Sequence, residues 1–318
     1  MVNALLIIIP VYNDWESLQV LQREIETCFI DNTLTSISFL IVDDSSEIKI
    51  NIDNYIKLKH QTIILELNQN LGHQKAIATG LAYAYGNLSA DHIIIMDGDG
   101  EDKPTDISIL LSKSPESKGI VFAKRTKRSE GFIFRLFYQL YKSIFKLLTG
   151  KSISFGNFCL IPSIYLSKIV HVADIWNHFS GGIIRSGVPY TALATERGKR
   201  YHGESKMNFT RLILHGLSAI SVYVDFMAIR LILFSVFLII ITAIGISIVV
   251  YIRIFTNLAI PGWATFTGLA LSMILFQSLI LGLFLLFNVL SLQTHKRIIP
   301  AKDYTDYVLN IKIIEPND

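Results

Sequence analysis

The sequence predicts an α/β domain with a mostly parallel sheet, followed by a hairpin of two transmembrane helices. Three observations support this prediction. Short apolar segments alternate with segments of helical periodicity in the first half of the chain, polar clusters follow several of the apolar segments, and two long uncharged stretches lie near the C-terminus. Strands that are apolar on both faces are typical of parallel sheets covered by helices on each side.

The order of elements in the first half follows from these patterns. The first apolar run stops at Pro10 and has no basic segment before it, so it is interpreted as a buried strand and not as a signal peptide. Pro104 stands at a favoured first-turn position and begins a helix, and Gly119 supplies the turn before the last strand. The expected strands are 5–9, 38–42, 62–65, 92–96 and 120–123, and the other expected helices are 15–29 and 73–85.

Two uncharged stretches, 231–252 and 265–293, are long enough to cross a bilayer core of about 30 Å at about 1.5 Å per residue. The connection between them holds one cation, Arg253, whereas several cations flank the pair on its outer side. Because positive residues stay on the cytoplasmic side, both flanks are expected in the cytoplasm. The flanking cations are Arg211, Arg230, Lys296, Arg297 and Lys302.

The expected organisation has four parts: a cytoplasmic α/β domain (1–208), a juxtamembrane interfacial segment (209–230), the two transmembrane helices (231–293) and a cytoplasmic tail (294–318). The segment 132–148 also has the character of an amphipathic interfacial helix, because Arg135, Lys142 and Lys146 fall within about 40° on a helix. A helix packed on its own domain with a solvated basic face is the alternative.

The composition excludes some functions. A net charge of +3 is too small to indicate a nucleic-acid partner. Cys28 and Cys159 lie far apart without a metal-binding spacing, so they are interpreted as buried thiols in a reducing compartment. The sequence contains neither the glycine pattern of dinucleotide-binding folds nor a P-loop, which leaves oxidoreduction with such cofactors and P-loop chemistry without support.

Polar clusters follow three of the expected strands, at 10–14, 43–46 and 97–102. In open parallel sheets, ligands bind beyond the carboxyl ends of the strands, so these clusters are expected to form one site. Carboxylates crowd the third cluster, and their mutual repulsion favours a bound cation. Hard carboxylate oxygens suit Mg²⁺ or Mn²⁺, and a substrate diphosphate completes such a shell. A metal site is therefore expected at Asp97-Gly98-Asp99.

These motifs resemble those of family-two glycosyltransferases of the GT-A fold, and most closely the polyprenyl-phosphate glycosyltransferases, the group of dolichol-phosphate mannose synthase and the bacterial undecaprenyl-phosphate transferases. The resemblance covers about residues 4–208, and the paired C-terminal spans fit the bacterial members. The matching segments are 8–14, 42–46, 70–74 with Ala76 and Gly80, 96–99 with Pro104, Lys124-Arg125, Arg135, 156–158, and Arg200 with 203–206.

The resemblance implies a membrane-bound hexosyl transferase that uses a nucleoside diphosphate sugar of the UDP or GDP type, a polyprenyl phosphate acceptor and Mg²⁺ or Mn²⁺; a homo-oligomer is left open. The nucleotide-sugar site would comprise Pro10, Tyr12, Asp14, Asp44, Gly72, Lys75, Asp97 and Gly98. The acceptor phosphate would meet Arg125, Arg135, Arg200, Ser205 and Lys206. The metal would be held by Asp97, Asp99 and Glu101. The residues assigned to catalysis are Asp97, Asp99, Arg125, Arg135, Arg200 and Lys206.

The chain departs from the family pattern at three places: the acidic cluster, where Gly98 also replaces a common alanine, the segment 156–158, and the unusually basic segment 124–128. Glu101 replaces a common glutamine within the acidic cluster, and Asn157 replaces a common aspartate. Two other functions remain open: a glycosyltransferase acting on another membrane acceptor, such as a glycolipid hydroxyl, and a non-catalytic membrane protein that keeps a sugar-nucleotide site. His73 is interpreted as a helix-start or packing residue and not as a catalyst.

Overall fold

A computed structural model describes residues 4–29, 36–50, 55–56, 58–125, 139, 143, 145–150, 155–202, 216, 218–257, 260, 262–294 and 296–316. The chain divides into two units. The first comprises residues 1–136, 153–222 and 297–318, and the second comprises 137–152 and 223–296. Each unit is described by itself.

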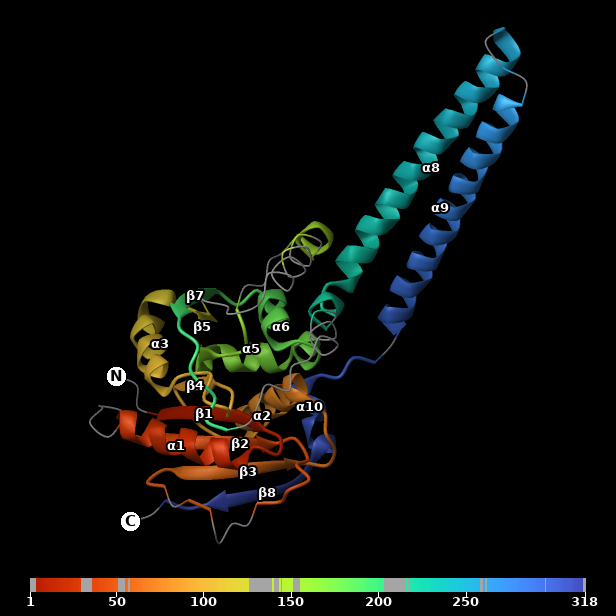
Figure 1. The fold of residues 1–318 in the computed structure, drawn as a ribbon. Coiled ribbons are helices and arrows are strands. Elements are labelled where there is room, and N and C mark those ends of the chain that lie inside the picture. Colours follow the sequence, from red (N-terminus) through yellow and green to blue (C-terminus); the bar gives the residue numbers. More distant parts are fainter. Residues whose placement is uncertain are drawn as a thin grey trace. The chain divides into compact units, whose positions relative to one another are not determined.

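The first unit is built on one sheet, which has eight strands in the described residues. Their order across the sheet is β7-β5-β6-β4-β1-β2-β3-β8 (Figure 1). Neighbouring strands β3, β2, β1 and β4 are parallel, whereas β6 and β8 run antiparallel to their neighbours. The strands are β1 Ala4–Val11, β2 Ser36–Asp43, β3 Gln61–Leu67, β4 His92–Ile95, β5 Ile120–Arg125, β6 Cys159–Pro162, β7 Tyr190–Thr195 and β8 Val308–Ile314.

Helices cover both faces of this sheet. On one face, α1 (Trp15–Phe29) and α3 (Pro104–Ser117) pack over the apolar side chains of β1, β2 and β4. On the other face lie α2 (His73–Asn87), α5 (Leu166–Val170) and α6 (Phe179–Ser186), with the short helix η3 (Ala173–Trp176). The predicted mostly parallel sheet with helices on both sides is therefore confirmed, and the first five predicted strands and three helices lie where the sequence places them.

The closest approach of helix to sheet occurs at Gly80 of α2. A Cβ atom at this position would lie 2.7 Å from Val42 Cγ2 and 2.9 Å from Ile8 Cγ2. Both distances are shorter than van der Waals contact, so only glycine lets α2 lie this close to β1 and β2. The start of α2, at His73, is thereby held near the carboxyl ends of these strands.

The C-terminal segment is not a separate tail. After the short helices α10 (Pro300–Asp303) and η4 (Tyr304–Tyr307), β8 pairs with the edge strand β3. Lys312 Nζ lies 2.6 Å from the buried carboxylate of Glu66, and Asn310 Nδ2 donates to the same carboxylate at 3.3 Å. Burial of this ion pair fixes the register of the last strand on the sheet.

The second unit contains two long apolar helices, α8 (Val224–Phe255) and α9 (Trp263–Thr294), which pack against each other (Figure 1). Both are long and apolar enough to cross a membrane. The buried residues of α8 recur every seven positions, which favours left-handed packing of two helices, and most have small side chains that let the backbones approach. They are Ala228, Ser235, Thr242 and Val249.

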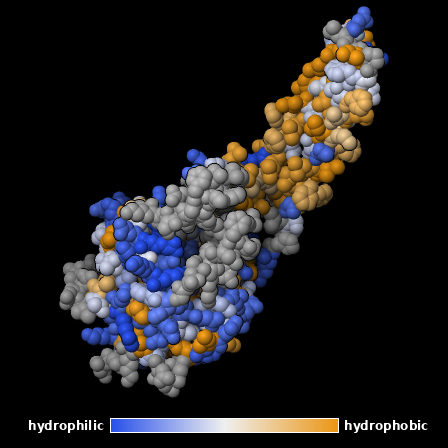
Figure 2. Space-filling model, in the orientation of Figure 1, coloured by the Kyte–Doolittle hydropathy of each residue, from blue (hydrophilic) through white to orange (hydrophobic). Residues whose placement is uncertain are grey.

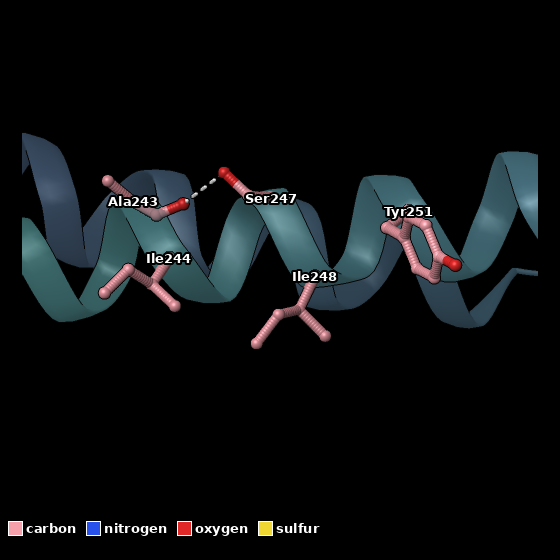
Figure 3. Close-up of a pocket in the computed structure, with 5 residues that line it drawn as sticks. All are labelled: Ala243, Ile244, Ser247, Ile248 and Tyr251. Carbon is pink, nitrogen blue, oxygen red and sulfur yellow. Dashed lines mark hydrogen bonds between the residues drawn. The ribbon is translucent and has the colours of Figure 1, made fainter.

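The outer surface of this helical pair is apolar (Figure 2). A shallow recess on α8 is also mostly apolar, and the hydroxyl group of its Ser247 donates a hydrogen bond to the Ala243 carbonyl at 2.9 Å (Figure 3). The recess is lined by Ala243, Ile244, Ser247, Ile248 and Tyr251. A surface of this kind fits lipid chains better than water.

Candidate functional site

The acidic turn, residues 97–102, follows β4 at the carboxyl edge of the sheet. β1 pairs with β4 on one side and with β2 on the other, so the chain order reverses at β1 and opens a crevice at this edge. Gly98 lies close to β1, since a Cβ there would be 3.3 Å from Ile9 Cγ2. Gly100 adopts a φ of 85°, a conformation that favours glycine.

Asp97 begins the acidic turn. Its Oδ1 atom is buried and receives no hydrogen bond from the residues that the structure describes, although His73 Nε2 lies 3.3 Å away. Burial and the charge of Asp99 raise the pKa of Asp97 to about 6. A buried carboxylate oxygen without a donor is unfavourable alone and is suited to a cation.

Asp99 and Glu101 are bound by arginines. Arg200 Nη2 lies 2.6 Å from Asp99 Oδ2, and its Nε donates to Glu101 Oε1 at 3.1 Å. Arg125 Nη1 reaches Glu101 Oε2 at 3.2 Å, and Arg197 Nη2 also contacts Glu101 Oε1. Burial would raise the pKa of the Glu101 carboxyl, but Arg197, Arg200 and Arg125 together bring it below its usual value.

Asp102 joins the acidic turn to β5. Its Oδ2 accepts the Asp97 backbone N–H at 3.0 Å, and its Oδ1 accepts Arg125 Nη2 at 3.0 Å. Burial and the charge of Asp97 raise the pKa of Asp102 to about 7. Its carboxylate therefore orders the turn.

The second half of the site is the arginine loop, residues 196–201, which follows β7. Its backbone is tied to the acidic turn by two hydrogen bonds, from Gly198 N to Glu101 O at 2.8 Å and from Tyr201 N to Asp99 O at 3.1 Å. A Cβ atom on Gly198 would lie 2.3 Å from the Gly100 carbonyl oxygen. Two glycines in contact therefore let the loop lie directly on the turn.

The structure gives Asp44 a role that differs from the one expected. Its Oδ1 accepts the N–H of Leu71 at 2.7 Å, and its Oδ2 accepts the N–H of Gly72 at 2.9 Å. Asp44 is only 4% exposed, and burial raises its pKa in spite of these bonds. Both carboxylate oxygens thus hold the turn before α2, where Gly72 has a φ of 89°.

The other residues expected at the nucleotide lie around the same edge. Pro10 is buried in β1, whereas Tyr12 is exposed just beyond this strand, with its hydroxyl 3.3 Å from Glu47. Asp14 is half-buried before α1, and its negative charge is close enough to contribute, after Asp99 and Glu101, to the raised pKa of Arg200. Lys75 Nζ lies 5.9 Å from the centre of the Trp176 ring.

Sequence reasoning missed two contacts. Arg197 carries no motif, and only the folding of its loop onto the turn reveals its contact with Glu101. His73 was interpreted as a packing residue, yet Asn157 Nδ2 lies 3.0 Å from its Nε2, beside Asp97. The predicted residues Arg135, Ser205 and Lys206 lie outside the described residues.

The donor set allows a metal, but with fewer protein ligands than expected. Asp97 offers an unused oxygen, whereas every oxygen of Glu101 already meets a guanidinium group. No cluster of three or more histidine, cysteine or acidic side chains is arranged to hold a metal among the described residues. One or two carboxylates, completed by substrate phosphate, fit Mg²⁺ or Mn²⁺.

Comparison with known proteins decides the family. The profile of "Glycosyl transferase family 2" matches residues 6–168, half of the chain. The chain belongs to this family. As a family-two glycosyltransferase it is 27% identical over 294 residues to the "Uncharacterized glycosyltransferase YkcC" of Bacillus subtilis (strain 168), a match that covers 88% of this chain and 84% of that protein. The resemblance noted in the sequence is therefore confirmed.

A second relative of this family-two glycosyltransferase is the "Undecaprenyl-phosphate 4-deoxy-4-formamido-L-arabinose transferase" of Proteus mirabilis (strain HI4320). It is 25% identical over 232 residues, which cover 67% of this chain and 65%, less than two thirds, of the relative. Among solved structures, glucosyl-3-phosphoglycerate synthase of Mycobacterium tuberculosis aligns with a TM-score of 0.50 at 10% identity, covering 71% of this chain and 78% of that one. This likeness and the sheet topology confirm the predicted GT-A fold.

Proposed function

We propose that this glycosyltransferase transfers a sugar from a nucleoside diphosphate sugar to a polyprenyl phosphate at the cytoplasmic face of a membrane. The observation that carries the proposal is the meeting, at one edge of the sheet, of the carboxylates of Asp97 and Asp99 with the guanidinium groups of Arg125 and Arg200. Carboxylates suit a metal that accompanies a diphosphate, and arginines suit a phosphate acceptor. The undecaprenyl-phosphate transferase among the relatives supports the choice of acceptor.

Asp97 and Asp99 would hold Mg²⁺ or Mn²⁺. When bound, such an ion acts as a Lewis acid on the departing diphosphate and stabilises its charge. The residues of the chain contribute the arrangement around it. Asp102 fixes the backbone of the acidic turn by accepting the Asp97 N–H, and Gly98 lets this turn lie close against β1.

The acceptor phosphate would bind to the basic side chains. A phosphate monoester is largely ionised near neutral pH and is already a nucleophile, so no general base is needed. Two anions must instead be brought together, and fixed guanidinium groups do this by bidentate hydrogen bonds. We assign this role to Arg125 and Arg200, together with Arg135, Ser205 and Lys206. A single displacement then inverts the configuration at the anomeric carbon.

The nucleotide would lie across the ends of β1 and β2. We assign contacts with the base and ribose to Pro10, Tyr12 and Asp14, whose positions at the end of β1 support the assignment. Asp44 and Gly72 would act by shaping the turn before α2, as the hydrogen bonds between them indicate. The exposed ring of Tyr12 offers a face for stacking with a base.

The membrane arrangement of the proposal is a hairpin. Because β8 follows α9 and pairs with β3, the segments on either side of the two long helices belong to one sheet. They must therefore lie on one side of a bilayer that α8 and α9 cross twice. The positive residues flanking the pair favour the cytoplasmic side.

Transfer to a lipid phosphate gives a product with a distinctive lability. Membranes that contain the full chain should be incubated with labelled nucleoside diphosphate sugars and undecaprenyl phosphate. A labelled lipid that mild acid releases supports the proposal. An acid-stable glycolipid would instead indicate a hydroxyl acceptor, and binding of the nucleotide sugar without transfer would indicate a non-catalytic protein.

The metal assignment has a matched control. Asp99→Ala should lower transfer by at least about 100-fold, since it removes both a metal ligand and the partner of Arg200. Glu116→Gln also changes an acidic side chain, exposed on α3, and should retain transfer. Equal activity of Asp99→Ala and Glu116→Gln would refute the assignment. Removal of metal by a chelator should abolish transfer, and Mg²⁺ or Mn²⁺ should restore it.

A further inference from the structure

Glu101 is the centre of a cluster of three arginines. Its Oε1 is approached by Arg197 Nη2 and by Arg200 Nε, the latter at 3.1 Å, and its Oε2 by Arg125 Nη1 at 3.2 Å. The carboxylate is buried, with 8% of the residue exposed. Three guanidinium donors meet the two oxygens of Glu101, against one donor on each oxygen of Asp99, so Glu101 is less suited than Asp99 to ligate a metal.

The position of Arg197 is set by the fold and is not that of a freely moving surface cation. Two backbone hydrogen bonds tie the arginine loop to the acidic turn on either side of Arg200. Gly198, the residue after Arg197, packs its Cα against the Gly100 carbonyl oxygen, so a side chain at 198 would displace the loop. The backbone of Arg197 is therefore held in place by the loop, and its guanidinium group is held by Glu101.

The three arginines around Glu101 differ in their other ion-pair partners. Arg125 also pairs with Asp102 and Arg200 with Asp99, whereas Glu101 is the one ion-pair partner of Arg197 among the residues that the structure describes. A guanidinium group carries five N–H donors. Arg197 uses one of its terminal nitrogens on Glu101, and 42% of its side chain remains exposed. Within the described residues, its other N–H donors are thus exposed beside the acidic turn and available to a ligand.

We propose that Glu101 serves to hold Arg197 beside Arg125 and Arg200, and that the three guanidinium groups form a phosphate-binding site in which Arg197 is a direct ligand. The ligand is a phosphate group of one of the two substrates. This inference rests on the proposed function for the identity of those substrates. It replaces the expected role of Glu101 as a metal ligand with that of a positioning residue.

Binding measurements on the full-length protein in detergent test the role of Arg197. Undecaprenyl phosphate and UDP are titrated separately against the wild type, Arg197→Gln and Lys199→Gln. Lys199 is an exposed cation on the same loop, which makes it the matched control. Arg197→Gln should lower the affinity for one of the two phosphate ligands by about tenfold, because it removes a charge-assisted hydrogen bond. Lys199→Gln should change either affinity by less than about threefold.

The two ligands identify the source of the phosphate. A loss confined to undecaprenyl phosphate assigns the site to the acceptor, and a loss confined to UDP assigns it to the donor. If Arg197→Gln and Lys199→Gln bind both ligands alike, Arg197 is not a phosphate ligand and the inference is wrong. A wild type that transfers no sugar to undecaprenyl phosphate would show that the proposed acceptor is wrong. If Arg197→Gln nevertheless lowers the affinity for UDP, the inference about the arginine site still holds.

The role of Glu101 is tested by Mn²⁺ binding, followed by electron paramagnetic resonance in the presence of UDP. Glu101→Gln should change the Mn²⁺ affinity by less than about threefold, whereas Asp99→Asn should weaken it by more than about tenfold. A loss in Glu101→Gln as large as that in Asp99→Asn would make Glu101 a metal ligand after all. In the Glu101→Gln background, Arg197→Gln should also have a smaller effect on phosphate binding than in the wild type, because Arg197 is no longer held.

Discussion

Replacing Asp44 by asparagine should destabilise the protein more than it affects nucleotide contacts. The two oxygens of Asp44 accept the N–H groups of Leu71 and Gly72 at 2.7 and 2.9 Å. Asparagine keeps one acceptor and turns an NH₂ group toward the other N–H. A hydrogen bond to a charged group contributes about 1.5–3 kcal/mol, and a buried donor left without a partner costs about 1–3 kcal/mol. We expect a loss of about 2–4 kcal/mol in the free energy of unfolding.

The assay is thermal unfolding of the full-length protein in detergent, monitored by tryptophan fluorescence. At about 2–4 °C per kcal/mol, Asp44→Asn should lower the unfolding temperature by about 5–12 °C. Glu47→Gln changes an exposed carboxylate three residues away and should leave it within about 2 °C. An unchanged unfolding temperature for Asp44→Asn, combined with loss of UDP binding, would show that Asp44 contacts the nucleotide and would refute this reasoning.

Three further variants test the packing of each unit. Gly80→Ala places a Cβ atom 2.7 Å from a β2 side chain and should cost about 1–3 kcal/mol of stability, measured by the same thermal unfolding. Lys312→Ala leaves the buried carboxylate of Glu66 without its cation and should cost about 2–3 kcal/mol of stability. This is less than for a fully buried ion pair, because the lysine is partly exposed. The double variant Lys312→Met with Glu66→Gln should recover most of this loss. Gly282→Leu should weaken disulfide cross-linking between two cysteines introduced one on α8 and one on α9, because a Cβ at 282 would lie 3.6 Å from an α8 side chain. Gly268→Leu faces open space and should not weaken it.

The elements that the sequence predicts well are those with a strong period and clear ends. The helix at 15–29 has the predicted limits and the next-but-one helix begins at Pro104 as predicted. Four of the first five strands contain their predicted range, and β4 ends one residue before it, at Ile95. Strands β6, β7 and β8 escaped prediction for different reasons. β6 has four residues, β7 is only partly buried, and β8 follows two apolar helices, so its place in the sheet depends on a pairing that no local pattern encodes.

The same distinction applies to the site. Asp97 and Asp99 follow a buried strand in a recognisable order, and the sequence brings them to the expected edge. The contact between Arg197 and Glu101 depends instead on the arginine loop folding onto the acidic turn, a long-range contact made by backbone hydrogen bonds. The direction of Asp44 likewise depends on the turn at Gly72, which lies far from it in sequence. Sequence patterns show which side chains gather but not which hydrogen bonds they form.

The position of β8 has a consequence for biosynthesis. Strands β1 to β7 leave the ribosome before the two long apolar helices, and the strand that covers the edge of β3 leaves last. Until then β3 presents unpaired backbone groups and Glu66 has no lysine beside it, which makes the nascent sheet prone to pairing with other chains. Completion of the sheet therefore reports that both apolar helices have been synthesised. A chain cut before β8 should be recognised as unfinished by cellular quality control, even if its acidic turn is intact.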